Sequence, residues 1–137
     1  MSDQIMVRLR PSPAAVAMAR EQLDRIRDRL TEEAYEDSRL MVSELVTNSL
    51  RHASLSTDQE IELVMVLRGA TLRVAVGDPG PGFEPRPRSL DDSVESGWGL
   101  FLVARLADRW GVDRDGLHHD GLHHRVWFEL DGAASAP

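Results

Sequence analysis

Three polar side chains recur at four-residue intervals in the stretch SELVTNSLRHA (residues 43–53): Glu44, Asn48 and His52. On an α-helix this spacing turns each side chain only about 40° from the last, so all three share one strip of the surface. An asparagine amide oxygen is a ligand that Mg²⁺ accepts, and a glutamate one turn away can take a proton or order a metal-bound water. The strip could therefore be a solvated helix face, or it could line a site for a magnesium phosphate.

The segment DPGPG (residues 78–82) places a carboxylate directly after a predicted strand. Asp78 at the end of a strand can accept a hydrogen bond from an exocyclic amine such as that of adenine. Gly80 and Gly82 lack side chains, so the backbone there can approach a flat base closely. An aspartate followed by glycines is also a common turn, so this segment alone leaves both interpretations open.

A third segment, SGWGL (residues 96–100), puts Gly97 and Gly99 at the expected start of a helix. Free N–H groups and the helix dipole at such a start attract phosphate without help from lysine. A phosphate site that needs no lysine is relevant here, because all sixteen basic residues are arginine and the chain contains no lysine. A Walker-type phosphate loop and a eukaryotic-type protein kinase both need a lysine, so the sequence excludes these two ways of binding a nucleotide.

The composition limits the kinds of partner that the protein can bind and indicates the cellular compartment in which it works. A chain of 137 residues with 42% apolar residues is long enough for one domain with its own core. The net charge of −7 argues against direct contact with nucleic acid or with an anionic membrane, since both reward clustered positive charge. The absence of cysteine excludes disulfides and thiolate chemistry. With no signal peptide and no long apolar run, the sequence predicts a cytoplasmic protein.

The apolar patterning predicts a single domain over residues 1–131 and a disordered tail of small residues, 132–137. The predicted strands are residues 5–10, 60–69, 71–78, 110–115 and 125–130, and the predicted helices are residues 12–30, 31–53 and 99–110. Ser12 and Thr31 are the expected N-caps, and Gly69 is the expected hairpin turn. The expected buried sides of the first two helices are Val16, Ala19, Leu23, Ile26 and Leu30, then Leu40, Met41, Leu45, Val46, Leu50 and Ala53.

In this order, ExxxN on a helix, DxGxG after a strand and GxGL opening a helix resemble the N, G1 and G2 boxes of one ATPase family. This is the Bergerat-fold family shared by histidine kinases, gyrase B, Hsp90 and MutL. The sequences ELVTNSLRHA and VWFEL look most like its stand-alone bacterial branch, the anti-sigma-factor serine-protein kinases. The resemblance spans about residues 5–130. It implies an α/β two-layer sandwich, in which helices pack on one face of a mixed, mostly antiparallel sheet.

The resemblance also implies ATP and Mg²⁺ as cofactors and gives the site residues their roles. Asn48 would coordinate Mg²⁺, and Glu44 would be the general base on the attacking serine hydroxyl or water. Asp78, helped by Gly80 and Gly82, would bind the adenine amino group. His52 and Ala53 also match the family pattern, where packing at the helix end is as good an interpretation as contact with nucleotide.

The phosphate end of the site is implied to lie at the GxGL segment. Gly97, Gly99 and Leu100 would open a helix toward the phosphates, and a lid formed by residues 83–96 would close over them. Kinases of this branch tend to have an arginine just before this segment, whereas Val94, Glu95 and Ser96 stand here. Arg86 or Arg88 in the lid could substitute, or they could be ordinary solvated loop charges.

A second departure lies before the last predicted strand. The family usually has glycine and small hydroxylated residues there, whereas this chain has His123, His124 and Arg125. The surrounding tandem repeat DGLHHDGLHH (115–124) could bind a transition metal or could simply be a polar hairpin tip. The three tryptophans are interpreted as packing residues: Trp98, Trp110 and Trp127.

Two functions remain open at this point. In the first, the protein is a serine-protein kinase that phosphorylates an anti-anti-sigma antagonist and, in its other state, sequesters a sigma factor. In the second, it is an ATP-dependent protein-binding module with weak or no catalysis. Intact Glu44 favours the first function and Glu95 favours the second. Relatives commonly dimerise, so a homodimer is also possible.

Overall fold

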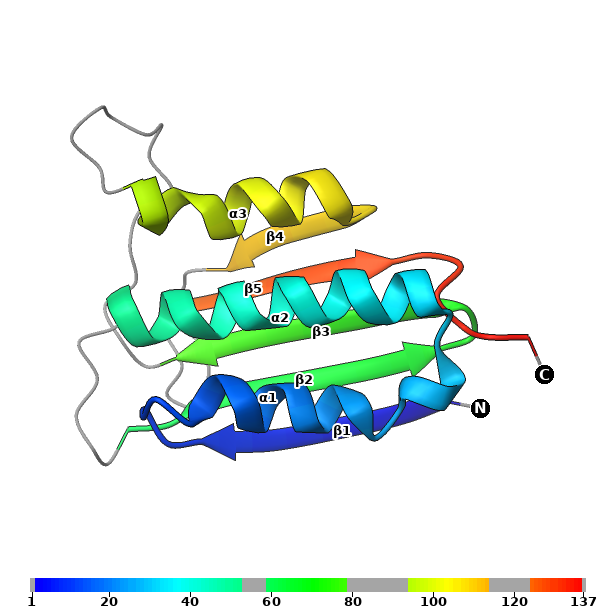
Figure 1. Cartoon of the computed structure of the whole chain (residues 1–137), viewed down its shortest axis with the longest axis horizontal. Helices are drawn as coiled ribbons and strands as arrows, with labels where there is room; N and C mark the ends of the chain where they lie inside the picture. Colours follow the sequence, from blue (N-terminus) through cyan, green and yellow to red (C-terminus); the bar gives the residue numbers. More distant parts are fainter. Residues whose placement is uncertain (1, 53–58, 79–93, 114–123, 137) are drawn as a thin grey trace.

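Five antiparallel strands form one sheet in the computed structural model, which describes residues 2–52, 59–78, 94–113 and 124–136 (Figure 1). The strand order is β1-β2-β3-β5-β4. The strands are β1 (Ser2–Leu9), β2 (Ile61–Arg68), β3 (Thr71–Asp78), β4 (Arg109–Asp113) and β5 (His124–Leu130). All pairs among these strands are antiparallel, so the described part of the sheet contains no parallel pair that would make it mixed.

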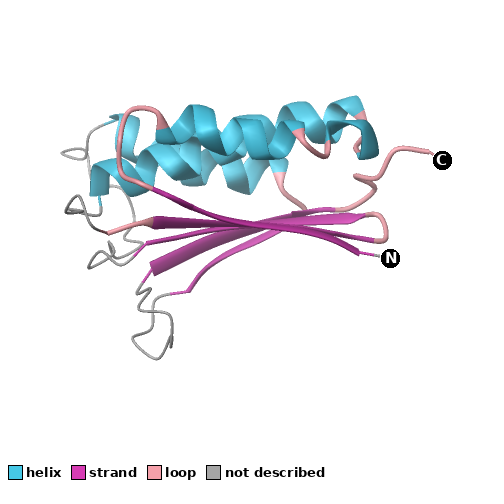
Figure 2. Ribbon diagram, turned by 90° about the horizontal axis from the view of Figure 1, so that it is seen from below, coloured by secondary structure: helices cyan, strands magenta, loops and turns pink. Residues whose placement is uncertain are grey.

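Three α-helices cover one face of this sheet and leave the other face uncovered (Figure 2). They are α1 (Ala15–Asp24), α2 (Glu32–His52) and α3 (Val94–Leu106), with a short 3₁₀ turn η1 (Arg27–Arg29) between the first two. This arrangement confirms the predicted α/β two-layer sandwich. Among the described residues, no helix is both long and apolar enough to cross a membrane.

Strand periodicity places the core between the two layers. Leu63, Met65 and Leu67 of β2 alternate with Glu62, Val64 and Val66, and only the first set belongs to the buried cluster. In β3 the core set is Leu72, Val74 and Val76, and in β5 it is Val126, Phe128 and Leu130. The hairpin predicted around Gly69 is confirmed: β2 pairs with β3, and Gly69 has a φ of 60°, a conformation that glycine adopts without strain.

The first two helices differ in detail from the prediction. Thr31 caps α2 as expected, since its Oγ1 accepts a hydrogen bond of 3.1 Å from the N–H of Ala34. Ser12 does not cap α1 with its side chain; α1 begins at Ala15 without a side-chain cap. Ile26 and Leu30 are buried, but in the turn after α1. Leu40, predicted to be buried, is 47% exposed.

The third helix starts earlier than its sequence predicts. It covers residues 94–106 instead of 99–110, so Gly97 and Gly99 lie inside α3 and not at its start. Its end is set by the sheet, because Arg109 already pairs with Glu129 as the first residue of β4. Each glycine inside a helix costs about 1 kcal/mol relative to alanine, so the opening turns of α3 have a weak intrinsic preference for helix.

The C-terminal segment, predicted to be disordered from residue 132, is ordered through residue 136. Gly132 turns the chain with a φ of 62°, and Ala133 is fully buried. The N–H of Ala133 donates to the carbonyl of Ala70, and the carbonyl of Ala133 accepts from Thr31. Small side chains let this segment lie flat against the end of the sheet, where its backbone groups find partners.

The tryptophan predictions are met in part. Trp127 projects from the uncovered face of the sheet, where its ring lies directly over Gly111 and 4.2 Å from the guanidinium carbon of Arg73. It is a packing residue, as predicted. Trp110 is 40% exposed at the edge of the sheet, so packing describes it poorly. The side chain of Trp98 lies outside the described residues.

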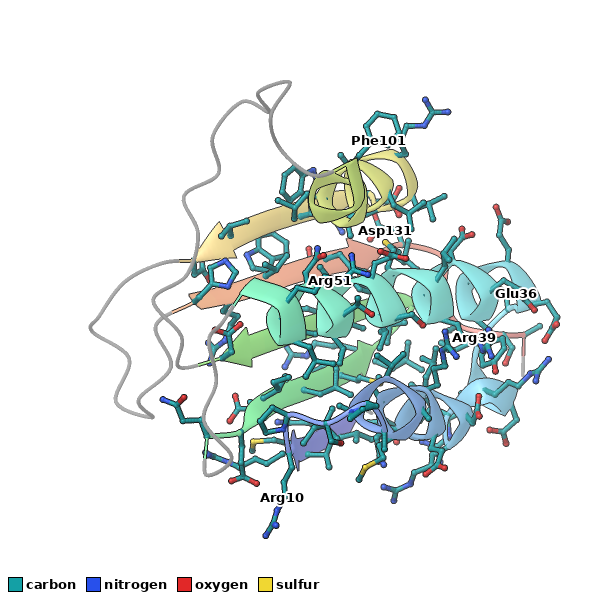
Figure 3. The ribbon with its side chains drawn as sticks, turned by 60° about the vertical axis from the view of Figure 1, so that its left-hand side comes forward. Arg10, Glu36, Arg39, Arg51, Phe101 and Asp131 are labelled. Carbon is teal, nitrogen blue, oxygen red and sulfur yellow. The ribbon has the colours of Figure 1, made fainter. Side chains whose placement is uncertain are left out.

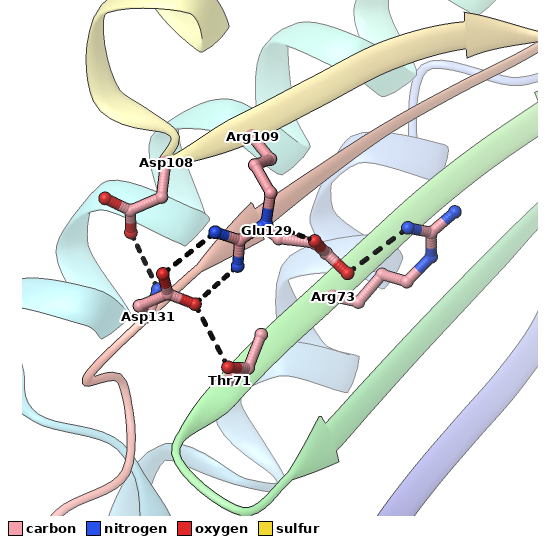
Figure 4. Close-up of polar contacts among 6 residues, drawn as sticks. All are labelled: Thr71, Arg73, Asp108, Arg109, Glu129 and Asp131. Carbon is pink, nitrogen blue, oxygen red and sulfur yellow. Dashed lines mark hydrogen bonds and ion pairs between the residues drawn. The ribbon is translucent and has the colours of Figure 1, made fainter.

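An ion-pair network joins β3, β4 and β5 on the uncovered face (Figure 4). Arg109 Nε donates to Glu129 Oε1 at 2.7 Å, and Arg109 Nη1 donates to Asp131 Oδ2 at 3.0 Å. Arg73 approaches the second oxygen of Glu129 at 3.3 Å, and Thr71 donates to Asp131 at 3.1 Å. Hydrogen bonds from Arg109 are the main cause that lowers the pKa of Glu129 and that of Asp131.

Because of the network around Arg109, we expect the free energy of unfolding to depend on pH in the acid range. Because the folded pKa values of Glu129 and Asp131 are lowered, their contribution is present above the ordinary values of 4.5 and 3.8 and is lost as pH falls through the folded values. Arg109→Gln should therefore lower the free energy of unfolding at pH 7 and have a smaller effect near pH 3, as measured by urea unfolding. Arg68→Gln, an exposed arginine of β2, is the control. An Arg109 effect that stays constant down to pH 3 would contradict this assignment.

Candidate functional site

Asn48 lies about one turn before the end of α2, with its side chain turned into the protein. Its exposed fraction is 6%, and its Oδ1 is sealed from solvent without a hydrogen-bond partner among the described residues. A buried carbonyl oxygen left unsatisfied costs about 1–3 kcal/mol, so native structures seldom keep one. This oxygen is therefore suited to a donor or a cation that the described residues do not supply.

Glu44 lies one turn earlier on the same strip of α2. It is partly buried, so it keeps contact with water while it flanks Asn48. The backbone of His52 continues the helix, but its side chain lies outside the described residues. The four-residue spacing read from the sequence thus places Glu44 and Asn48 on one helix face, as expected for two groups that serve one site.

Asp78 ends β3 with its carboxylate in the layer between helices and sheet. It is 1% exposed, and its Oδ2 accepts a hydrogen bond of 2.9 Å from Ser49 Oγ. Ser49 directly follows Asn48 on α2, so this bond brings the two predicted halves of the site together. Sequence reasoning did not single out Ser49; the usable signal was its place beside Asn48, on the side of α2 that faces the sheet.

His124 lies elsewhere than either interpretation of the histidine repeat, a metal site or a polar hairpin tip, predicts. It is the first residue of β5, is 4% exposed and stands directly opposite Asp78 in the strand register. Its Nδ1 lies 3.6 Å from Asp78 Oδ2. The signal was available, because strand alternation puts His124 on the same face as the buried Val126, Phe128 and Leu130.

A second buried carboxylate, Glu62, lies on the opposite face of the sheet. It is 6% exposed and is paired with Arg8 and Arg125, each at 3.5 Å. These two arginines compensate the charge of Glu62 within the protein. Glu62 therefore has a structural role, and it does not belong to the site around Asp78.

The remaining predicted residues are placed only in part. Leu100 is partly buried against the core, and its helix α3 packs along α2. Several predicted residues lie outside the described residues: Gly80, Gly82, most of the proposed lid (83–93), His118, His119 and His123. Within the described part, no group of three or more histidine, aspartate or glutamate residues could hold a metal ion. The site lies toward the Arg51 end of α2, whereas Glu36 marks the other end of that helix (Figure 3).

Comparisons with known proteins identify the family of this chain. A family model described as "Histidine kinase-like ATPase domain" matches residues 9–121. The protein named serine-protein kinase RsbW of Listeria monocytogenes serotype 4a is 34% identical over 122 residues, which cover 79% of this chain and 78% of the relative. RsbW of Listeria innocua serovar 6a gives the same identity and coverage.

A solved structure agrees with the fold. The crystal structure of the RsbU and RsbW domains of Rv1364c from Mycobacterium tuberculosis superimposes with a TM-score of 0.70 over 98% of this chain, at 18% identity. This chain spans 33% of that longer protein. The buried asparagine, the carboxylate at the strand end and the family model over most of the sequence lead to one conclusion: the chain belongs to the histidine kinase-like ATPase family.

Proposed function

We propose that this protein binds Mg²⁺-ATP and transfers the terminal phosphate to a serine of an anti-anti-sigma antagonist protein. In its other state it would sequester a sigma factor. The observation that carries the proposal is the buried Oδ1 of Asn48, left unsatisfied by the described residues one position before the serine that holds Asp78. The similarity to proteins named serine-protein kinase supports the choice of reaction.

The adenine end of the site would be Asp78. Its carboxylate accepts hydrogen bonds only, and it is buried, which makes it suited to the exocyclic amino group of adenine. Because its Oδ2 is held by Ser49, the carboxylate has a fixed direction before the nucleotide arrives. Gly80 and Gly82 would let the backbone reach the base, as the family resemblance implies.

The phosphate end would be Asn48, which would hold Mg²⁺ through its amide oxygen. The donor set fits, since Mg²⁺ prefers oxygen ligands and Oδ1 is buried without a hydrogen bond from the described residues. Magnesium bound to ATP neutralises charge on the phosphates during transfer. Gly97, Gly99 and Leu100 lie inside α3, so they would offer backbone N–H groups to the phosphates only after the opening turns of the helix rearrange, and the two glycines lower the cost of that rearrangement.

Glu44 would act as the general base. Its partial exposure lets it pass a proton to water, and its place one turn from Asn48 puts it beside the phosphate end. In the proposed step the serine hydroxyl gives its proton to Glu44 while its oxygen forms a bond to the terminal phosphorus. The bond from that phosphorus to the ADP oxygen breaks, and ADP leaves with the electron pair.

The antagonist and the sigma factor remain proposed partners, and a homodimer is proposed as the assembled form. A kinase that uses ATP and acts on transcription factors would work in the cytoplasm. The acidic net charge of −7 is consistent with protein partners and gives no support to direct binding of DNA or RNA.

We expect Asp78→Asn to weaken ATP binding by about tenfold or more, because an amide can turn a donor toward the adenine amino group. Isothermal calorimetry with Mg²⁺-ATP measures the effect. Glu62→Gln is the matched control: it makes the same chemical change in a buried carboxylate on the other face of the sheet. It should lower stability and spare affinity, and equal losses in both variants would count against the adenine role.

Asn48→Ala should remove most of the gain in ATP affinity that Mg²⁺ provides, because the amide oxygen would no longer reach the metal. The measurement is ATP affinity with magnesium and with EDTA in each variant. Thr47→Ala changes the neighbouring residue, whose hydroxyl donates to the helix carbonyl of Ser43, and serves as control. A magnesium effect of wild-type size in Asn48→Ala would rule out the proposed ligand.

Glu44→Ala should leave ATP affinity nearly unchanged and abolish phosphate transfer, because the base acts only in the chemical step. Mass spectrometry of the antagonist protein after incubation with Mg²⁺-ATP detects one added phosphate. Glu36→Ala, an exposed glutamate two turns earlier on α2, should retain transfer. If the wild-type protein binds ATP and adds no phosphate, the result selects the ATP-dependent binding module instead of the kinase.

A further inference from the structure

His124 occupies an unusual place in an otherwise apolar pattern. On the inward face of β5 the other residues are Val126, Phe128 and Leu130, all in the core. On the inward face of β3 the residues before Asp78 are likewise aliphatic. The two polar inward side chains of these neighbouring strands are therefore paired with each other, in register, at the end of the sheet where the nucleotide site is proposed.

The contact orients the imidazole ring. Nδ1 lies 3.6 Å from Asp78 Oδ2, a few tenths of an ångström beyond hydrogen-bond distance, and both side chains are almost fully buried. A carboxylate only accepts, so the stable arrangement is the tautomer that carries its proton on Nδ1. Ser49 Oγ donates to the same oxygen from α2. One hydrogen-bond donor, from α2, and one close imidazole nitrogen, from β5, thus face Oδ2.

We propose that His124 is a positioning residue that sets the base specificity of the nucleotide site. The hydrogen bond from Ser49 holds Oδ2 of Asp78, and the imidazole of His124 beside the same oxygen would limit rotation of the carboxylate, so that its second oxygen keeps one direction. A fixed acceptor favours a purine with an amino group at C6 and repels one with an oxo group there. This inference rests on the proposed ATP site and adds the residue that makes it select 6-amino purines.

A purely structural role would not require a histidine at this position. Burying an imidazole costs more than burying a leucine unless its polar atoms are used. If His124 only packs, a protein with leucine at this position should be at least as stable and should keep the same nucleotide preference. A positioning role predicts that the donor facing Asp78 is what matters, and that asparagine, whose amide nitrogen can stand near the place of Nδ1, preserves it.

The test compares ATP with ITP, which carries an oxo group at C6. Calorimetry gives the affinity of each nucleotide, with magnesium, for the full chain and for His124→Leu, His124→Asn and Val126→Ala. Val126 is the next inward residue of β5 and is also buried, so Val126→Ala reports the effect of weakening this strand without touching Asp78. Thermal unfolding of every variant is measured in parallel.

His124→Leu should lose about tenfold in ATP affinity and much less in ITP affinity, so that the preference for ATP falls by a similar factor. His124→Asn should keep the preference, and Val126→Ala should lower the melting temperature while keeping it. The proposal would be overturned if His124→Leu kept the wild-type preference for ATP over ITP. It would also be overturned if Val126→Ala lost as much of that preference as His124→Leu. If the wild-type protein failed to bind ATP at all, the proposed function itself would fail, and this inference with it.

Discussion

The hydrogen bond from Ser49 to Asp78 is the contact on which the rest of the site depends. It ties the second half of α2 to the last residue of β3, and it does so in the buried layer, where water does not compete. One position along α2, Asn48 is thereby held at a fixed offset from the Asp78 carboxylate. A ligand that spans these two groups meets a polar acceptor at one end and an unsatisfied amide oxygen at the other.

The lengths of the elements explain why the site forms at this end of the molecule. The 21 residues of α2 extend over about 31 Å, whereas an eight-residue strand such as β3 extends over about 27 Å. The helix therefore runs the full length of the sheet, and its last turns lie over the end of β3. Leu45 and Val46 close the apolar core. Polar residues begin one turn later, where the core ends.

The sequence predicted the layers and most of the elements because periodicity is local information. Alternation in β2 and β3 and the capping threonine of α2 were each readable from neighbouring residues. The start of α3 was not, since glycines argue for a helix end and the packing of α3 along α2 overrides them. The order of the C-terminal segment also depends on tertiary contacts that local patterns do not reveal. Its small residues carry no periodic signal, and the backbone partners of Ala133 are Ala70 and Thr31, which are far away in the sequence.

Two buried polar side chains of the described residues, Glu62 and Asn48, illustrate the difference between a structural and a functional role. Glu62 is compensated by two arginines of the protein itself, so its burial is complete without any ligand. The described residues leave the amide oxygen of Asn48 without a hydrogen bond, and this lowers the free energy of unfolding. Selection for stability alone would not keep such a residue. The fold could bury a leucine at position 48 and gain stability. The asparagine is therefore best explained by a group that arrives from outside, and the same reasoning makes His124, the polar residue facing Asp78, part of that site.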